Sequence, residues 1–180
     1  SGGLNSSPII LQCVFTNNCA YQGGGIFSNA YSNGNSSPLI KNSYFISNRA
    51  LEGNFVWAGK GGAIYFNGGN RGKIFSIIKN CYFFDNIAKR GGGIYGLGDS
   101  GGICSPVIDS CTFENNHAVE KGAGIFNDAT FSGNNYPVVK NSLFKNNKAN
   151  NGAGIFNNSY FASASSPKIN NCIFQANSSI

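Results

Sequence analysis

Hydrophobic residues occur in short alternating segments along the whole chain, and asparagine or glycine interrupts each segment. In residues 10–15, for example, apolar side chains stand at Ile10, Cys13 and Phe15. Such alternation is typical of strands with one buried face, and no apolar stripe with the 3.6-residue period of a helix is sustained anywhere. The pattern predicts an all-β protein built from short strands.

The strand-like segments belong to a repeat of about 30 residues, which occurs five times and begins a sixth time. Its first landmark is a phenylalanine that is followed three residues later by an asparagine. The phenylalanines are Phe15, Phe45, Phe83, Phe113, Phe144 and Phe174, and the asparagines are Asn18, Asn48, Asn86, Asn116, Asn147 and Asn177. The second landmark is an isoleucine that follows small residues, at Ile26, Ile64, Ile94, Ile125 and Ile155. Repetition at a fixed period is typical of solenoids.

One repeat is longer than the others. Eight more residues separate Phe45 from Ile64 than separate the corresponding residues of the first repeat. The surplus lies near residues 51–60 and contains Trp57, the only tryptophan. We expect a loop insertion there on an otherwise constant turn.

A single repeat cannot bury its own apolar side, because it has only two or three short strands followed by a loop of about eleven residues. Neighbouring repeats must therefore stack and share a continuous core. We expect residues 1–180 to form one domain, a right-handed parallel β-helix (solenoid) of about six turns. Stacking places equivalent residues about 4.8 Å apart, so each column of the alignment becomes a ladder along the axis.

The columns make chemical sense as ladders. The phenylalanines form an aromatic ladder, and the asparagines that follow them form a hydrogen-bonded amide ladder at a corner. An inward column of small residues contains Cys13, Ser43, Cys81, Cys111, Ser142 and Cys172. A disulfide between Cys81 and Cys111 would strain an in-register parallel pair, so free thiols are favoured. Cys19 and Cys104 lie outside this column, and their state stays open.

Composition and charge narrow the range of partners. Only 11% of the residues are charged, and the net charge of +6 comes from scattered lysines and arginines. We therefore expect no nucleic-acid partner. No apolar stretch approaches the length of a transmembrane helix, so we also expect no direct membrane insertion. Neither end has an obvious cap, and the two ends are in phase. This predicts a segment of a longer β-helix or a subunit that self-associates end to end.

Catalytic chemistry has few candidates. Asp109 and Glu114, five residues apart, come nearest to a carboxylate cluster, and solvated surface acids are the simpler explanation. His117, the only histidine, occupies a column that accepts any residue type. We therefore predict no catalytic residue, no cofactor and no metal site.

A column of lysines is a candidate interaction surface. Lys41, Lys79 and Lys140 share an outward column, which Asp109 interrupts. They form either a basic stripe for anionic glycans or a set of lysines that keeps the surface soluble and deters edge pairing.

Two further outward columns are more apolar than a solvated face requires. One contains Val14, Tyr44, Tyr82, Leu143 and Ile173, and the other contains Ile9, Leu39, Ile77, Val107 and Val138. Either the loops of the chain, whose aromatic residues are Tyr31, Phe131 and Phe161, cover this surface, or another subunit does. We take Tyr44, Tyr82 and Trp57 as candidate interaction residues.

The motifs also resemble those of a known family. Residues 61–64 read Gly-Gly-Ala-Ile, and Gly-Gly-Gly-Ile or Gly-Ala-Gly-Ile stands at the same place in other repeats. Together with Phe-x-x-Asn, this resembles the repeats of the chlamydial polymorphic outer-membrane proteins over essentially the whole chain. The resemblance implies a surface-exposed, adhesive β-helix. A wider similarity is to the pectin-lyase-like fold, which includes both enzymes and inert fibres.

We therefore expect a secreted, extracellular or cell-surface structural protein without a cofactor, which acts as a fibre, stalk or adhesin segment. One alternative is a polysaccharide lyase or hydrolase of the pectin-lyase-like fold. Another is a binding module for host or extracellular anionic glycans.

Overall fold

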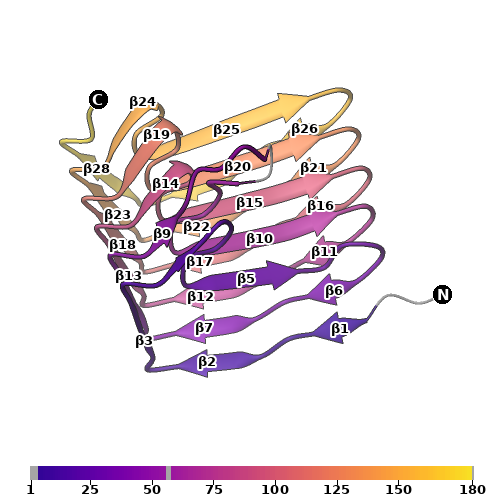
Figure 1. The fold of residues 1–180 in the computed structure, drawn as a ribbon, viewed down its shortest axis with the longest axis horizontal. Coiled ribbons are helices and arrows are strands. Elements are labelled where there is room, and N and C mark those ends of the chain that lie inside the picture. The colour runs from indigo at the N-terminus through magenta and orange to yellow at the C-terminus, as the bar shows by residue number, and fades with distance from the viewer. Residues whose placement is uncertain (1–3, 56–57, 180) are drawn as a thin grey trace.

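The chain is wound into a parallel β-helix of about six turns (Figure 1), and the computed structural model describes residues 4–55 and 58–179 of it. These residues form 28 short strands and no helix, so none of their elements is an apolar helix of membrane-spanning length. A complete turn contributes five strands, and equivalent strands stack into five parallel sheets, which we name A to E in chain order. The predicted parallel β-helix is confirmed.

Sheets A, B and C have six strands each. Sheet A contains β1 (Asn5–Ser6), β6 (Asn35–Ser36), β11 (Lys73–Ile74), β16 (Ile103–Cys104), β21 (Asn134–Asn135) and β26 (Ala164–Ser165). Sheet B contains β2 (Ile9–Leu11), β7 (Leu39–Lys41), β12 (Ile77–Lys79), β17 (Val107–Asp109), β22 (Val138–Lys140) and β27 (Lys168–Asn170). Sheet C contains β3 (Val14–Thr16), β8 (Tyr44–Ile46), β13 (Tyr82–Phe84), β18 (Thr112–Glu114), β23 (Leu143–Lys145) and β28 (Ile173–Gln175).

Sheets D and E have five strands each. Sheet D contains β4 (Cys19–Ala20), β9 (Arg49–Ala50), β14 (Ile87–Arg90), β19 (His117–Lys121) and β24 (Lys148–Asn151). Sheet E contains β5 (Ile26–Asn29), β10 (Ile64–Gly69), β15 (Ile94–Asp99), β20 (Ile125–Thr130) and β25 (Ile155–Tyr160).

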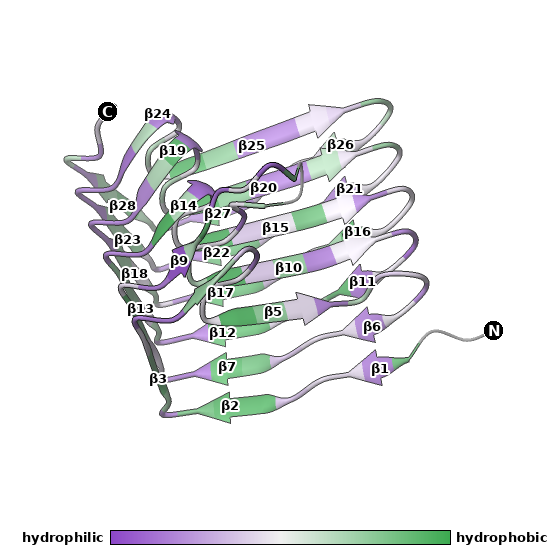
Figure 2. Ribbon diagram, viewed as in Figure 1, coloured by the Kyte–Doolittle hydropathy of each residue, from purple (hydrophilic) through white to green (hydrophobic). Residues whose placement is uncertain are grey.

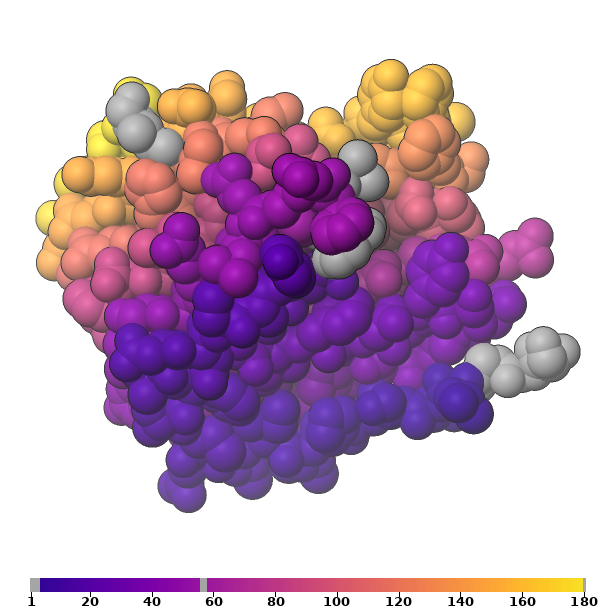
Figure 3. All heavy atoms as spheres, in the orientation of Figure 1, coloured from indigo at the N-terminus to yellow at the C-terminus, as the bar shows by residue number. Residues whose placement is uncertain are grey.

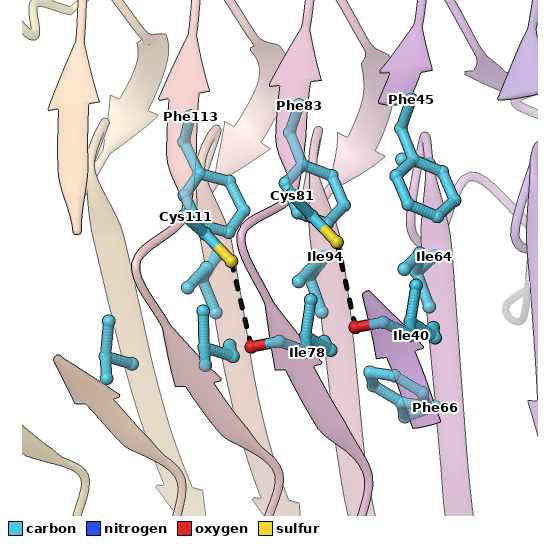
Figure 4. Packing of buried hydrophobic residues seen from close by; sticks show 14 of the residues in the cluster. Ile40, Phe45, Ile64, Phe66, Ile78, Cys81, Phe83, Ile94, Cys111 and Phe113 are labelled. Atoms are coloured by element: carbon cyan, nitrogen blue, oxygen red, sulfur yellow. Dashed lines mark hydrogen bonds between the residues drawn. The ribbon is translucent and has the colours of Figure 1, made fainter. Parts of the chain in front are cut away.

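Successive turns pair in register, which converts each repeated residue into a column. Ile40 of β7, for example, lies between Ile10 of β2 and Ile78 of β12. Inward columns of isoleucine, phenylalanine and cysteine fill the core between the sheets (Figure 4). In Figure 2, β2 and β7 are mostly hydrophobic, and β5 and β25 begin with hydrophobic residues. The core is therefore continuous along the axis, as the repeat predicts.

The corners of each turn use left-handed backbone. Between sheets B and C, Asn42 and Asn80 each have a φ of 52°, and between sheets C and D Asn115 has a φ of 55°. Asparagine tolerates this region better than most residues that carry a side chain. Between sheets D and E the left-handed residue is a glycine in every turn. At Gly122, with a φ of 65°, a β-carbon would lie 2.5 Å from the carbonyl oxygen of Ile125.

The prediction of a loop of about eleven residues after the glycine-rich motif is wrong for most of that segment. The segment forms the second half of a sheet E strand, a tight turn and a sheet A strand, so a complete turn has five strands instead of two or three. Inward side chains on these strands are buried, as at Phe66 and Ile74. Some inward residues are polar: the hydroxyls of Ser28 and Ser36 share a 2.8 Å hydrogen bond, and Asn135 Nδ2 donates to the carbonyl of Gly96.

The loop insertion between β9 and β10 is confirmed. The amide of Gly59 donates to the carbonyl of Tyr21, and Gly59 in turn accepts from the amide of Lys89. Lys60 already pairs with the neighbouring turns, so the repeat resumes there. In the views of Figures 1 and 3 the insertion appears in front of later turns. The candidate residue Trp57 lies outside the described residues.

Candidate functional site

The predicted phenylalanine ladder is confirmed. The six rings lie parallel, with centroids 4.6 to 4.9 Å apart and interplanar angles of 1° to 7°. Phe45, Phe83, Phe113 and Phe144 are fully buried. The in-register stacking of the turns fixes this spacing, so the ladder belongs to the core and leaves no aromatic face for a ligand in the middle turns.

The asparagine ladder is also confirmed, and it satisfies its amides fully. Asn116 shows the pattern: its Nδ2 donates to Asn147 Oδ1 and to the carbonyl of Phe83, both at 3.0 Å. Its Oδ1 accepts from the backbone amide and the Nδ2 of Asn86. Each buried side-chain amide thus uses two donors and two acceptor positions, which removes the cost of burying a polar group.

The cysteine column is inward, and all six cysteines are free thiols. Cys81 and Cys111 are buried, and their thiols donate to carbonyl oxygens of Ile40 and Ile78 on the preceding turn (Figure 4). Cys104 is fully buried outside the column, where burial raises the pKa of its thiol, whereas Cys19 is exposed. The expected thiol column is therefore confirmed.

The lysine column does not form a continuous basic stripe. Lys79 and Lys140 both lie within salt-bridge distance of Asp109, at 3.9 and 3.6 Å. A hydrogen bond from Asn141 lowers the pKa of Asp109, with further contributions from both lysines. Among the described residues, Lys41 is the one member of the column without such a partner. The central carboxylate therefore neutralises much of the positive charge.

Tyr82 and Tyr44 differ in their surroundings. The hydroxyl of Tyr82 donates to Glu114 at 2.6 Å, and Lys145 lies 3.3 Å from the same carboxylate. Partial burial and this hydrogen bond raise the pKa of Tyr82 to about 12, and the same hydrogen bond lowers the pKa of Glu114. Tyr44 is 51% exposed and packs edge-on against Tyr82.

The idea that the chain's own loops shield the apolar columns is wrong at several positions. Ile9, Val14, Tyr44, Ile77 and Ile173 are all exposed. The aromatic residues expected to cover them, Tyr31, Phe131 and Phe161, lie in the turns that follow sheet E and are each 55% exposed. Two of them stack on each other, with ring centroids 5.0 Å apart. These turns are too tight to fold back over sheets B and C.

The outer face of sheet E carries a buried cluster that we did not predict. Tyr65, Tyr95 and Phe126 form an aromatic cluster separate from the main core, and each is no more than 2% exposed. The ammonium of Lys60 lies 5.3 Å from the ring centroid of Tyr95, whose hydroxyl donates to Asp128. Burial lowers the pKa of Lys60, although Asp128 opposes the shift. The sequence signal was the aromatic residue that follows the isoleucine in every repeat.

Cations from successive turns border this aromatic cluster. Lys60, Arg90 and Lys121 pair in register. Arg90 binds Glu120 at 2.6 Å, and the ammonium of Lys121 lies 4.8 Å from the ring centroid of Phe156. These contacts are stabilising cation–π and ion-pair interactions, so the column serves the packing of sheet E.

A groove of about 880 Å³ runs along the outer face of sheet D. We call it the sheet D groove. Four residues from successive turns share its central column, namely Arg49, Ile87, His117 and Lys148. Other lining residues are Asp85, Asn115 and Asn146 at the left-handed corners on one side and Glu52 and Val119 on the other. Sequence patterns do not reveal a groove around His117, because its lining comes from five successive turns.

Across residues 4–55 and 58–179, no three His, Cys, Asp or Glu side chains gather into a possible metal-binding group. Asp109 and Glu114 lie on the same turn, but Asp109 pairs with Lys79 and Lys140, whereas Glu114 pairs with Lys145.

Comparison with known proteins points to one family. Residues 12–29, 42–67, 80–97 and 110–128 match the Chlamydia polymorphic membrane protein repeat. Each match begins at the left-handed corner before sheet C and ends within a sheet E strand, so it contains both Phe-x-x-Asn and the glycine-rich motif. No curated protein and no solved structure gives a significant match. The chain is therefore a β-helix repeat protein that resembles the polymorphic membrane proteins of Chlamydia.

Proposed function

We propose that the chain is a surface-exposed, non-catalytic β-helical segment that acts in adhesion. The observation that carries this proposal is the difference between the inward columns, which are buried, and the outward columns, which include exposed apolar side chains. Inward residue types recur in every turn and contact one another in the ladders, whereas outward residues such as Val14, Tyr44 and Ile77 are exposed. Exposed apolar side chains on a rigid scaffold favour contact with another macromolecule. The match to a repeat of membrane proteins supports a location at the cell surface.

The carboxylates support a non-catalytic function over polysaccharide cleavage. A general acid for glycosidic bonds needs a raised pKa, as burial in an apolar pocket provides. Hydrogen bonds lower the pKa of Asp109 and of Glu114 instead. Both side chains are therefore suited to ion pairing with the neighbouring lysines.

The test combines location with adhesion. Antibodies raised against the folded chain are expected to label intact cells of the source organism without permeabilisation. Beads coated with the chain are expected to adhere to cultured host cells more than beads coated with albumin. The double variant Val14→Ser, Tyr44→Ser tests the exposed apolar surface. It keeps every inward residue and is expected to adhere less than the native chain. Labelling only after permeabilisation, together with no adhesion above the albumin level, would contradict the proposal.

The non-catalytic part has a separate test. The purified chain is expected to release no unsaturated or reducing ends from a panel of acidic polysaccharides. Product release that disappears in an Asp109→Asn variant would establish the enzymatic alternative.

A further inference from the structure

The sheet D groove has the shape and chemistry of a binding site for an extended chain. Its four central positions repeat with the spacing of parallel strands, so they extend over roughly 14 Å along the axis. The backbone of sheet D is already hydrogen-bonded between turns, as in the bond from the amide of His117 to the carbonyl of Asn86. A bound peptide would thus gain no main-chain pairing here, which removes the usual advantage of peptide docking on a sheet.

The charges of the groove are available to a ligand. Arg49 and Lys148 have no carboxylate within 4.0 Å among the described residues. This distinguishes them from Lys79 and Lys140, which Asp109 neutralises. Unpaired cations at both ends of the central column favour an anionic ligand.

The two halves of the groove differ. Glu52 and Asp85 are lining residues from the earlier turns, near Arg49. Around His117 and Lys148 the lining consists of asparagines and apolar side chains, without a carboxylate. The later half is therefore the half suited to an anionic group.

Neutral residues of the groove suit a carbohydrate. The side-chain amides of Asn115 and Asn146 can donate to and accept from hydroxyl groups. Ile87 is 37% exposed and Val119 is 39% exposed, so both offer apolar surface to the face of a sugar ring. Hydroxyls, apolar ring faces and regularly spaced anionic groups occur together in acidic polysaccharides.

We propose that the sheet D groove binds an acidic polysaccharide along the helix axis, with a carboxylate or sulfate group held between His117 and Lys148. The inference rests on the proposed adhesive function and names the ligand class for it. It assigns the anionic-glycan site to sheet D instead of the column of Lys41, Lys79 and Lys140.

Direct binding tests the proposal. Fluorescence anisotropy would be measured for labelled oligosaccharides of defined length from three sources: heparin-type chains, polygalacturonate and neutral dextran. Binding of either anionic chain without binding of dextran is expected. Comparison of the sulfated and the carboxylate-only chains identifies the anionic group. Absence of binding by both anionic chains would overturn the proposal.

Matched lysine variants locate the site. Lys148→Ala is expected to weaken binding about tenfold, because a hydrogen-bonded charge is lost. Lys168→Ala removes the same charge from an exposed position on sheet B and is expected to change affinity less than about twofold. Equal losses in the two variants would show non-specific attraction and overturn the assignment. Competition by a polyglutamate peptide at the same concentration as the oligosaccharide would overturn the polysaccharide class.

Substitution of His117 gives an independent readout. His117 pairs in register with Lys148, and both line the groove. His117→Gln is therefore expected to weaken binding of the anionic oligosaccharides. Unchanged affinity in this variant would overturn the place assigned to His117.

The adhesion assay separates this inference from the proposed function. If beads coated with the native chain adhere to cells but the chain binds no oligosaccharide, the binding role of the sheet D groove is overturned and the adhesive function stands. Oligosaccharide binding by a chain whose beads do not adhere supports the groove and overturns the adhesive function.

Discussion

Gly124 lies against the ring of Phe144, the ladder phenylalanine of the following turn. A β-carbon at Gly124 would lie 2.8 Å from Cδ1 of Phe144. The same contact recurs at Gly154, where a β-carbon would lie 2.8 Å from Cδ1 of Phe174. The glycine-rich motif and Phe-x-x-Asn, which are separate in the sequence, therefore meet inside the helix, and each restricts the residues that the other can use.

The first prediction concerns this contact. Gly124→Ala is expected to lower the free energy of unfolding by about 1–3 kcal/mol through overpacking. Phe144→Leu should relieve part of this cost in the double variant, so the two effects should deviate from additivity by about 0.5 kcal/mol or more. Relief is partial because the β-carbon would also lie 2.4 Å from the carbonyl oxygen of Gly154. Urea unfolding of the four proteins measures the coupling, and strictly additive effects would contradict it.

The second prediction concerns the amide ladder. Asn116→Ala removes the acceptor for Asn86 and leaves the buried carbonyl of Phe83 without its side-chain donor. We expect a loss of about 3 kcal/mol in the free energy of unfolding. Asn80→Gly is the control: Asn80 is exposed and left-handed, so glycine keeps its backbone conformation and the change should stay within about 0.5 kcal/mol. Similar losses at both positions would mean that the buried ladder has no special contribution.

The third prediction concerns the thiols. Under native conditions without reductant, a maleimide should label Cys19 quickly and Cys81, Cys104 and Cys111 slowly, because the latter three are buried. Burial also raises the pKa of Cys104, which lowers its reactive thiolate fraction. After denaturation, mass spectrometry should count all six thiols as labelled. Only four labelled thiols after denaturation would indicate a disulfide.

The fourth prediction concerns acid stability. Asp109 and Glu114 have folded-state pKa values below the ordinary range, through hydrogen bonds from Asn141 and Tyr82 respectively. Their stabilising contribution is therefore complete above the unfolded carboxyl pKa of about 4 and is lost as the pH falls through the lower folded-state values. Between pH 7 and pH 2.5, the Tm of the native protein should fall more than that of the Asp109→Asn, Glu114→Gln variant. Parallel curves would argue against both shifts.

The ladders could be predicted from the sequence because the turns stack in register. A residue type that recurs in every repeat therefore contacts its equivalent in the next turn. Sheet A could not be predicted in this way, because its inward positions include Ser36 and Asn135, which look like loop residues in a hydropathy pattern. Their burial depends on partners from other segments: Ser36 bonds with Ser28, and Asn135 donates to the carbonyl of Gly96. Polar pairing across the inside of the helix carries no periodic apolar signal.

The sheet D groove escaped prediction for a related reason. Its central column holds Arg49, Ile87, His117 and Lys148. This mixture of cationic, apolar and imidazole side chains gives no uniform ladder in the sequence, so the column looks like one that accepts any residue type. Corner residues and strands of five successive turns complete the lining around that column. Only the three-dimensional arrangement brings an unpaired cation, a histidine and two asparagines to one surface.

The turns depart from uniform length at two sites, and both lie between the Phe-x-x-Asn motif and the glycine-rich motif. One is the insertion after Ala50, and the other is the extra residue of the bulge in β19. These segments contribute Glu52 and Val119 to the groove. Natural variation can therefore reshape one side of the groove while the ladders remain constant, much as antibody domains diversify hypervariable loops on a conserved framework. Repeat proteins built in this way can acquire new specificities without having to evolve a new fold.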